Sequence, residues 1–112
     1  MIRLLYPGGK TKALTFSYDD GKIHDRRLVK LFNTHGLKAT FHLNSGLMGD
    51  RDWLIQPGID VSHYKLRRDE IKEVYDGFEI AVHTMTHPDL TTVPSSMAAW
   101  EISENKRDLE AL

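Results

Sequence analysis

The chain has 112 residues, no cysteine and a formal charge of −1 at pH 7. This length allows one domain at most, the absence of cysteine excludes disulfides and thiolate metal sites, and the charge leaves no basic excess for binding nucleic acid. No apolar run is long enough to span a membrane, and residues 1–7 make a poor signal peptide, so we expect a cytoplasmic protein without a membrane partner.

The first part of the chain contains three predicted strands and one helix. A short strand is expected over 2–6, ahead of the turn-forming residues 7–9, and a longer one over 12–18. Apolar residues at helical spacing, followed by a glycine, predict a helix over 25–35. Alternating apolar and polar residues then predict a strand over 37–43.

The second part begins with residues 44–65, which show no clear period and are interpreted as a long excursion with room for a short strand. A helix is expected over 67–75 and a strand over 78–82. Pro94 fits the first turn of a last helix that runs towards Leu112. The inner face of that helix follows the helical period imperfectly, through Met97, Trp100 or Glu101, Asn105 and Leu109.

Strands and helices alternate along the chain, which predicts an α/β architecture with parallel strands and crossover helices. In such folds ligands gather at the carboxyl ends of the strands. Two polar motifs follow predicted strands, at residues 19–21 and 83–87. We therefore expect them to share one edge of the sheet.

The first motif places Asp19 beside Asp20, directly after apolar and β-branched residues and before Gly21. An Asp-Gly pair is also a common turn, so the motif is ambiguous when taken alone. Two neighbouring carboxylates repel each other unless something offsets their charge. A divalent cation would do so, binding one aspartate and leaving the other beside it as a base; the residues themselves do not say which is which.

The second motif, His83-Thr84-Met85-Thr86-His87, supplies two imidazoles. Two histidines and a carboxylate are a common ligand set for a metal ion that keeps an open position for water. Because Pro88 follows at once, we expect a loop that closes on the metal and not a helix. The remaining histidines are expected to be hydrogen-bonded, half-buried rings: His24, His35, His42 and His63.

Three stretches resemble the polysaccharide deacetylase family, also called the NodB-homology domain. They are Thr-Phe-Ser-Tyr-Asp-Asp-Gly (15–21), Ala-Thr-Phe-His-Leu (39–43) and Glu-Ile-Ala-Val-His-Thr-Met-Thr-His-Pro (79–88). The first is similar to the family's aspartate-pair motif and the last to its His-[Ser/Thr]-x-x-His motif. The resemblance covers nearly the whole chain, from about Lys12 onward.

The resemblance implies a distorted (β/α) barrel and metal-dependent hydrolysis of N-acetyl or O-acetyl groups on sugars. By the same resemblance, Asp19 is the general base, and Asp20, His83 and His87 hold the metal. The metal is usually Zn²⁺, with Co²⁺, Ni²⁺, Fe²⁺ and Mn²⁺ as alternatives. Thr84 matches the position whose hydroxyl braces the loop between the histidines.

The family barrel needs roughly twice this length, and the later motifs that supply a base-tuning arginine and aspartate and an acid histidine are absent. We therefore expect 1–112 to be a single partial deacetylase domain, either a fragment or a truncated relative. A half barrel leaves a parallel strand unpaired at its edge, so we expect self-association or contact with the missing half.

Three alternatives remain at this point. The same fold and metal would also suit a hydrolase of a small non-peptide amide, imide or ureide. A non-haem iron oxygenase uses two histidines and a carboxylate as well, but it gives the second aspartate no role. A non-catalytic module with a structural metal normally has four protein ligands, whereas this sequence offers three strong candidates.

Overall fold

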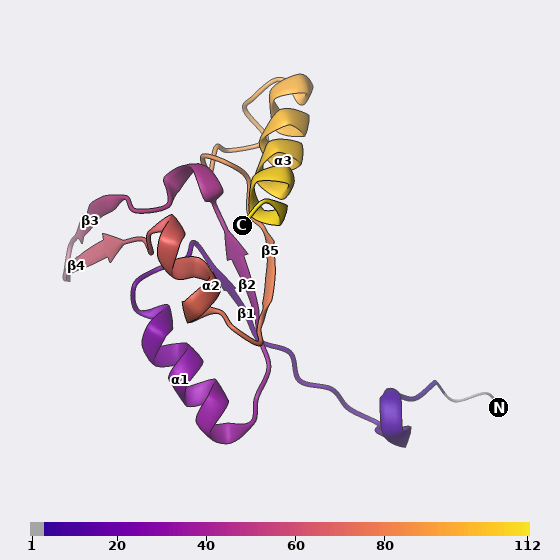
Figure 1. Cartoon of the computed structure of the whole chain (residues 1–112). Helices are drawn as coiled ribbons and strands as arrows, with labels where there is room; N and C mark the ends of the chain where they lie inside the picture. The colour runs from indigo at the N-terminus through magenta and orange to yellow at the C-terminus, as the bar shows by residue number, and fades with distance from the viewer. Residues whose placement is uncertain (1–3) are drawn as a thin grey trace.

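A sheet of three parallel strands forms the centre of the computed structural model, which describes residues 4–112. β1 (Ser17–Asp19), β2 (Thr40–Leu43) and β5 (Glu79–Val82) lie in that order, with β2 in the middle (Figure 1). The predicted α/β class with parallel strands is therefore confirmed. The strands among the described residues form an open sheet, so closure into a barrel remains a prediction.

The helices follow the strands in the expected order. α1 (Asp25–His35) has the predicted bounds, because Gly36 adopts a left-handed φ of 63° and its N–H donates to the last carbonyls of the helix. The helix predicted over 67–75 is a 3-10 turn, η3 (Arg68–Glu70), continued by the short α2 (Ile71–Val74). α3 (Ser95–Glu110) is the last element.

The apolar core lies between one face of the sheet and the helices α1 and α2. Phe41 of β2 is completely buried, and its ring lies 4.6 Å from that of Tyr75 and 5.6 Å from that of Phe78, centroid to centroid. Aromatic pairs at such spacings add to the free energy gained from burying apolar area. The buried core residues are Val29, Phe32, Ala39, Phe41, Leu43, Leu66, Ile71, Val74 and Tyr75.

Two predicted strands are shorter than the sequence pattern indicated. The strand expected over 12–18 begins only at Ser17, and the one expected over 37–43 begins at Thr40. The ladder starts where the backbone N–H of Thr40 donates to the carbonyl of Phe16, and residues 11–15 are exposed. Their β-branched composition alone does not form a strand because they have no neighbour with which to pair.

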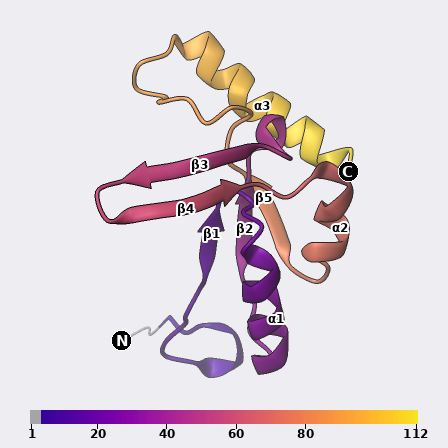
Figure 2. The ribbon, with the colours of Figure 1, turned by 90° about the vertical axis from the view of Figure 1, so that its left-hand side faces the viewer.

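The excursion over 44–65 is more regular than predicted. After a 3-10 turn, η2 (Ser45–Leu47), it forms an antiparallel hairpin of β3 (Arg51–Gln56) and β4 (Ile59–Tyr64) that projects across the carboxyl ends of the parallel strands (Figure 2). Gly58 makes the tight turn with a left-handed φ of 80°. The apolar period is weak because most residues of the hairpin, on both faces, are exposed.

The amino-terminal segment leads away from the sheet (Figure 1). Residues 7–9 form a 3-10 turn, η1 (Pro7–Gly9), in agreement with the predicted turn. Residues 2 and 3 of the strand expected over 2–6 lie outside the described part of the chain, and Tyr6 makes only an isolated bridge to Lys10. No strand is therefore present over 4–6.

The last helix buries two of the positions that its imperfect period indicated for the inner face, Glu101 and Asn105, and both are polar. Met97 and Trp100 are 44% and 49% exposed, whereas Glu101 and Asn105 are almost completely buried. Pro94 precedes the first turn of the helix as its N-cap. Among residues 4–112, no helix combines the length and apolar composition that a membrane crossing requires.

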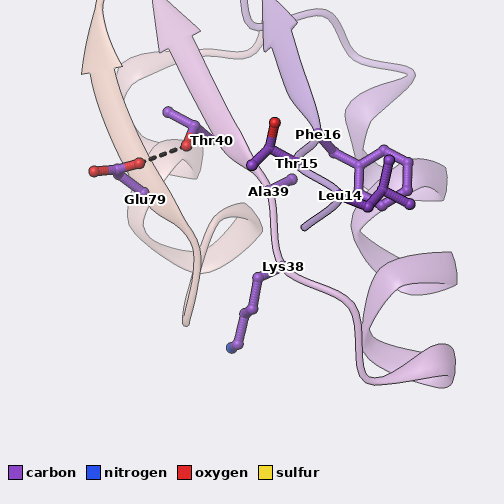
Figure 3. Close-up of a pocket in the computed structure, with 7 residues that line it drawn as sticks. All are labelled: Leu14, Thr15, Phe16, Lys38, Ala39, Thr40 and Glu79. Atoms are coloured by element: carbon purple, nitrogen blue, oxygen red, sulfur yellow. Dashed lines mark hydrogen bonds between the residues drawn. The ribbon is translucent and has the colours of Figure 1, made fainter. Parts of the chain in front are cut away.

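A shallow pocket of about 290 Å³ opens at the amino ends of the strands (Figure 3). There the hydroxyl of Thr40 donates to the carboxylate of Glu79, and Lys38 lies at the rim. The pocket contains no histidine and lies at the end of the sheet away from both polar motifs. It is therefore not the candidate site.

Asp25, at the start of α1, should make stability depend on pH. Burial raises the pKa of its carboxyl, although the hydroxyl of Tyr75 donates to it over 2.6 Å and partly offsets this. A raised folded-state pKa contributes stability that is complete below the ordinary value of 3.8 and is lost as pH rises through the folded value. We expect the unfolding free energy of wild type, relative to Asp25→Asn, to increase as pH falls from 7 to 4.

Urea unfolding at several pH values measures this difference. Tyr75→Phe is the informative companion, because it removes the hydrogen bond that opposes burial and should make the pH dependence steeper. A difference between wild type and Asp25→Asn that shrinks or stays constant towards pH 4 would contradict the interpretation.

Candidate metal centre

The side chains of the two adjacent aspartates point in different directions because the backbone turns between them. Asp19 ends β1, and Asp20 follows with a left-handed φ of 77°, its N–H donating to the carbonyl of His42 over 2.9 Å. The side chain of Asp19 is 60% exposed and that of Asp20 only 22%. A non-glycine residue in this region is strained, and such strain is concentrated at functional sites.

The histidine motif is a loop, as predicted, which starts where β5 ends at Val82. Thr84 and His87 also have left-handed φ values, of 67° and 57°. The backbone N–H of His87 donates to the hydroxyl of Thr84 over 3.1 Å, which closes the loop on itself. The two imidazole rings consequently lie with their centroids 4.9 Å apart.

Asp20, His83 and His87 converge at the carboxyl ends of β1 and β5. Oδ1 of Asp20 lies 3.7 Å from Nε2 of His83 and 3.7 Å from Nε2 of His87. One donor atom from each of the three side chains lies within 4.8 Å of the other two. The structure thus brings together the three residues for which the family resemblance implied metal ligation.

The surroundings of Asp20 fit a bound cation. Oδ1 is buried and has no hydrogen-bond donor among the described residues, while Oδ2 accepts from Nζ of Lys22 over 3.0 Å. Nζ of Lys65 lies 3.6 Å from Oδ1, within ion-pair range but beyond hydrogen-bond distance. A buried carboxylate oxygen without a donor is costly. Two imidazole nitrogens and a carboxylate oxygen are ligands that a divalent metal accepts in an open site.

The neighbouring lysines keep Asp20 ionised. Burial alone would raise its pKa, but the hydrogen bond from Lys22 and the charge of Lys65 outweigh burial, so the pKa lies below its ordinary value. Lys22 also donates to Nδ1 of His63 over 2.8 Å. The sequence interpretation missed both lysines. Lys22 could have been noticed, because it lies two positions after Asp20. Lys65 could not, because it follows β4 and is distant from Asp20 in the sequence.

Asp19 also lies at the carboxyl ends of the strands, but outside the group of three converging residues. Its Oδ1 is 3.4 Å from Nδ1 of His42, the residue opposite it in the register of β1 and β2. Nδ1 of His42 also hydrogen-bonds Oγ of Ser17 over 3.2 Å. His42 and His63 are therefore half-buried and hydrogen-bonded, as expected.

The same expectation is wrong for His24 and His35, which are exposed. His24 is the residue before α1, and His35 lies in its last turn. The helical positions that face the core are taken by Val29 and Phe32. Neither histidine belongs to the group that converges at Asp20.

Comparison with known proteins identifies the family of the chain. A sequence model of the polysaccharide deacetylase family matches residues 7–112. The chain belongs to the polysaccharide deacetylase family. Comparison with curated proteins gives no significant match.

A solved structure supports the fold. It is the Streptococcus pyogenes deacetylase PplD in complex with acetate, which this chain matches with a TM-score of 0.71 and 23% sequence identity. The match covers 90% of this chain and 41% of that one. The chain thus has the fold of part of a deacetylase structure and spans less than half of its length.

The convergence at Asp20 predicts that zinc stabilises the folded chain. Zinc at about 100 times its Kd should raise the unfolding free energy by about 2.7 kcal/mol, since a ligand that binds only the folded state stabilises it by mass action. His87→Ala should lose most of this increase. Denaturant unfolding with and without zinc measures it, and His35→Ala, an exposed histidine outside the site, is the control. Equal stabilisation of wild type and His87→Ala would count against His87 as a ligand.

Proposed function

We propose that this chain is the metal-binding part of a hydrolase that removes acetyl groups from N- or O-acetylated sugars. The observation that carries the proposal is the approach of two imidazoles to Oδ1 of Asp20, which is buried and has no hydrogen-bond donor in the described part of the chain. Membership of the polysaccharide deacetylase family supports the same reaction. The bond broken would be a carbon–nitrogen amide bond or an ester bond outside a peptide.

Asp20, His83 and His87 would hold the metal, Zn²⁺ in the first place. When bound, such an ion polarises the acyl carbonyl and lowers the pKa of a coordinated water. Lys22 holds Oδ2 of Asp20 and leaves Oδ1 turned towards the imidazoles. Because only these three side chains converge among residues 4–112, the site favours open coordination over a closed structural one.

Asp19 is proposed as the general base. Its carboxylate is exposed at the same edge as Asp20 and is not one of the three converging ligands, so it is free to accept a proton from water. His42 lies 3.4 Å from it and would restrict the orientation of the carboxylate. The structure therefore gives the two aspartates different environments, one exposed and one enclosed by lysines.

The substrate class is inferred from the family. The related structure contains acetate, which is the expected product of deacetylation. N-acetylated and O-acetylated sugars are therefore the first candidates, and small amides, imides or ureides are the alternative substrates on the same fold. The general acid is proposed to come from residues outside this chain.

We further propose that residues 1–112 form one partial domain whose barrel is completed at β5. β5 is an edge strand, and a groove of about 330 Å³ lies between it and α3. Ile80 is 36% exposed there, and an unpaired parallel strand normally has a covering neighbour. The next strand of the barrel would pair with this edge, supplied by the missing half or, in self-association, by a second copy.

The division of roles between the aspartates can be tested directly. Asp19→Asn should reduce acetate release by about 10²- to 10⁴-fold, the usual contribution of a general base, while zinc affinity by titration calorimetry stays close to that of wild type. Asp20→Asn, in contrast, should weaken zinc binding. Oligomers of N-acetylglucosamine, O-acetylated sugars and small N-acetyl amides are the substrates to compare.

Loss of zinc binding in Asp19→Asn but not in Asp20→Asn would reverse the two roles. A wild-type chain that takes up no zinc would end the proposal. Zinc uptake without acetate release from any substrate would restrict the function of this chain to metal binding.

A further inference from the structure

The buried face of α3 is polar, and its side chains contact the histidine loop. Glu101 is 1% exposed and Asn105 is fully buried, whereas Ile102 on the same helix is 44% exposed. Burying a carboxylate and an amide costs free energy unless their atoms are hydrogen-bonded. The side chains of Glu101 and Asn105 bond to the loop 83–87 and to the adjoining η2 turn.

Asn105 fixes the beginning of the loop. Its Oδ1 accepts the backbone N–H of His83 over 2.8 Å, and its Nδ2 donates to Oγ of Ser45 over 2.9 Å. Both polar atoms of the amide are thus hydrogen-bonded, Oδ1 to the first histidine of the motif and Nδ2 to η2. An apolar residue at this position would leave the N–H of His83 without a protein partner.

Glu101 fixes the middle of the loop. Its two carboxylate oxygens accept the backbone N–H of Thr86 over 2.8 Å and the hydroxyl of Thr86 over 2.6 Å. Its backbone carbonyl accepts the N–H of Met85 over 3.2 Å. Although burial alone would raise the pKa of Glu101, the bonds from Thr86 outweigh it and keep the pKa below its ordinary value.

The opposite side of the loop is held by residues that follow β2. Nδ2 of Asn44 donates to the carbonyls of His83 and Thr84. The N–H of Gly46 donates to the carbonyl of Met85 over 3.1 Å, and a Cβ at Gly46 would lie 2.8 Å from that oxygen. The loop is therefore enclosed between the segment after β2 and the helix α3.

These contacts bear on the metal site because the loop is strained. Left-handed φ angles at Thr84 and His87 cost free energy and persist only when surrounding contacts over-determine them. The loop conformation also decides where both imidazoles point. A ligand set that is already ordered loses less conformational entropy on binding and so binds more tightly.

We propose that Glu101 and Asn105 are positioning residues of the metal centre, which fix the backbone of residues 83–86 so that His83 and His87 both face Asp20. This inference rests on the proposed metal site. The two side chains bond to the loop backbone and to Thr86, so they act on affinity through the loop. Loss of such supporting contacts typically weakens metal binding by about 10- to 100-fold.

The test measures the Kd for Zn²⁺ by titration calorimetry and the visible absorption of bound Co²⁺, which reports ligand geometry. Glu101→Ala and Asn105→Ala should weaken zinc binding by about 10- to 100-fold and change the Co²⁺ spectrum. Glu101→Gln should restore near-wild-type binding, because its amide oxygen can accept the Thr86 N–H while its NH₂ donates to the Thr86 hydroxyl. Ile102→Ala, on the exposed face of α3, is the matched control.

Thr86→Val is a second, milder variant for the case in which Glu101→Ala does not fold. It removes the hydroxyl that donates to Glu101 at an exposed position, and it should weaken zinc binding several-fold in a chain of native circular dichroism. A purely structural role would lower the melting temperature and leave the Kd of the folded chain unchanged. Wild-type Kd values and Co²⁺ spectra in all folded variants would overturn the inference. A wild type that binds no zinc would instead show that the proposed metal site itself has failed.

Discussion

A carboxylate oxygen buried beside two imidazoles is the constraint on which the site depends. Oδ1 of Asp20 lies 3.7 Å from a nitrogen of each ring and has no hydrogen-bond donor within residues 4–112. Such an atom is unfavourable unless positive charge lies close to it. Lys22 and Lys65 supply part of that charge, and the geometry leaves the side facing His83 and His87 for a metal ion.

The protein reaches this arrangement by separating its apolar and polar contacts. Aromatic and aliphatic residues on one face of β2 pack against α1 and α2 and form the core. The polar buried groups gather at the carboxyl ends of the strands, where Asn44, Glu101 and Asn105 bond to the backbone of the histidine loop. Left-handed residues, which cost free energy elsewhere, are tolerated here because these contacts hold them in place.

The unpaired edge strand β5 separates what the described chain contains from what the proposed reaction requires. The proposed metal ligands and the proposed base all come from residues 19–87. The groove beside β5 and the match to 41% of a longer deacetylase structure favour further strands at this edge. In the proposed function, binding of the ion and completion of the reaction therefore belong to different parts of one folded unit.

The sequence alone determined that the two polar motifs follow parallel strands, the bounds of α1, and the aspartate pair and the two histidines from which the site is built. These features are encoded locally, by helical period, by a glycine after the helix, and by polar residues placed directly after strands. The proposed roles of Asp19 as base and Asp20 as ligand are not encoded by the neighbouring residues. They came from the family resemblance, and the structure adds different environments for the two carboxylates.

Only the tertiary structure decided which polar residues support the site. Lys65 lies far from Asp20 in the sequence and reaches it because the hairpin folds back beside residue 22. Glu101 and Asn105 occupy positions that helical period assigned to an apolar face, and their burial is explained by the strained loop that they contact. Long-range hydrogen bonds leave no periodic signal in a sequence, whereas burial of apolar side chains does.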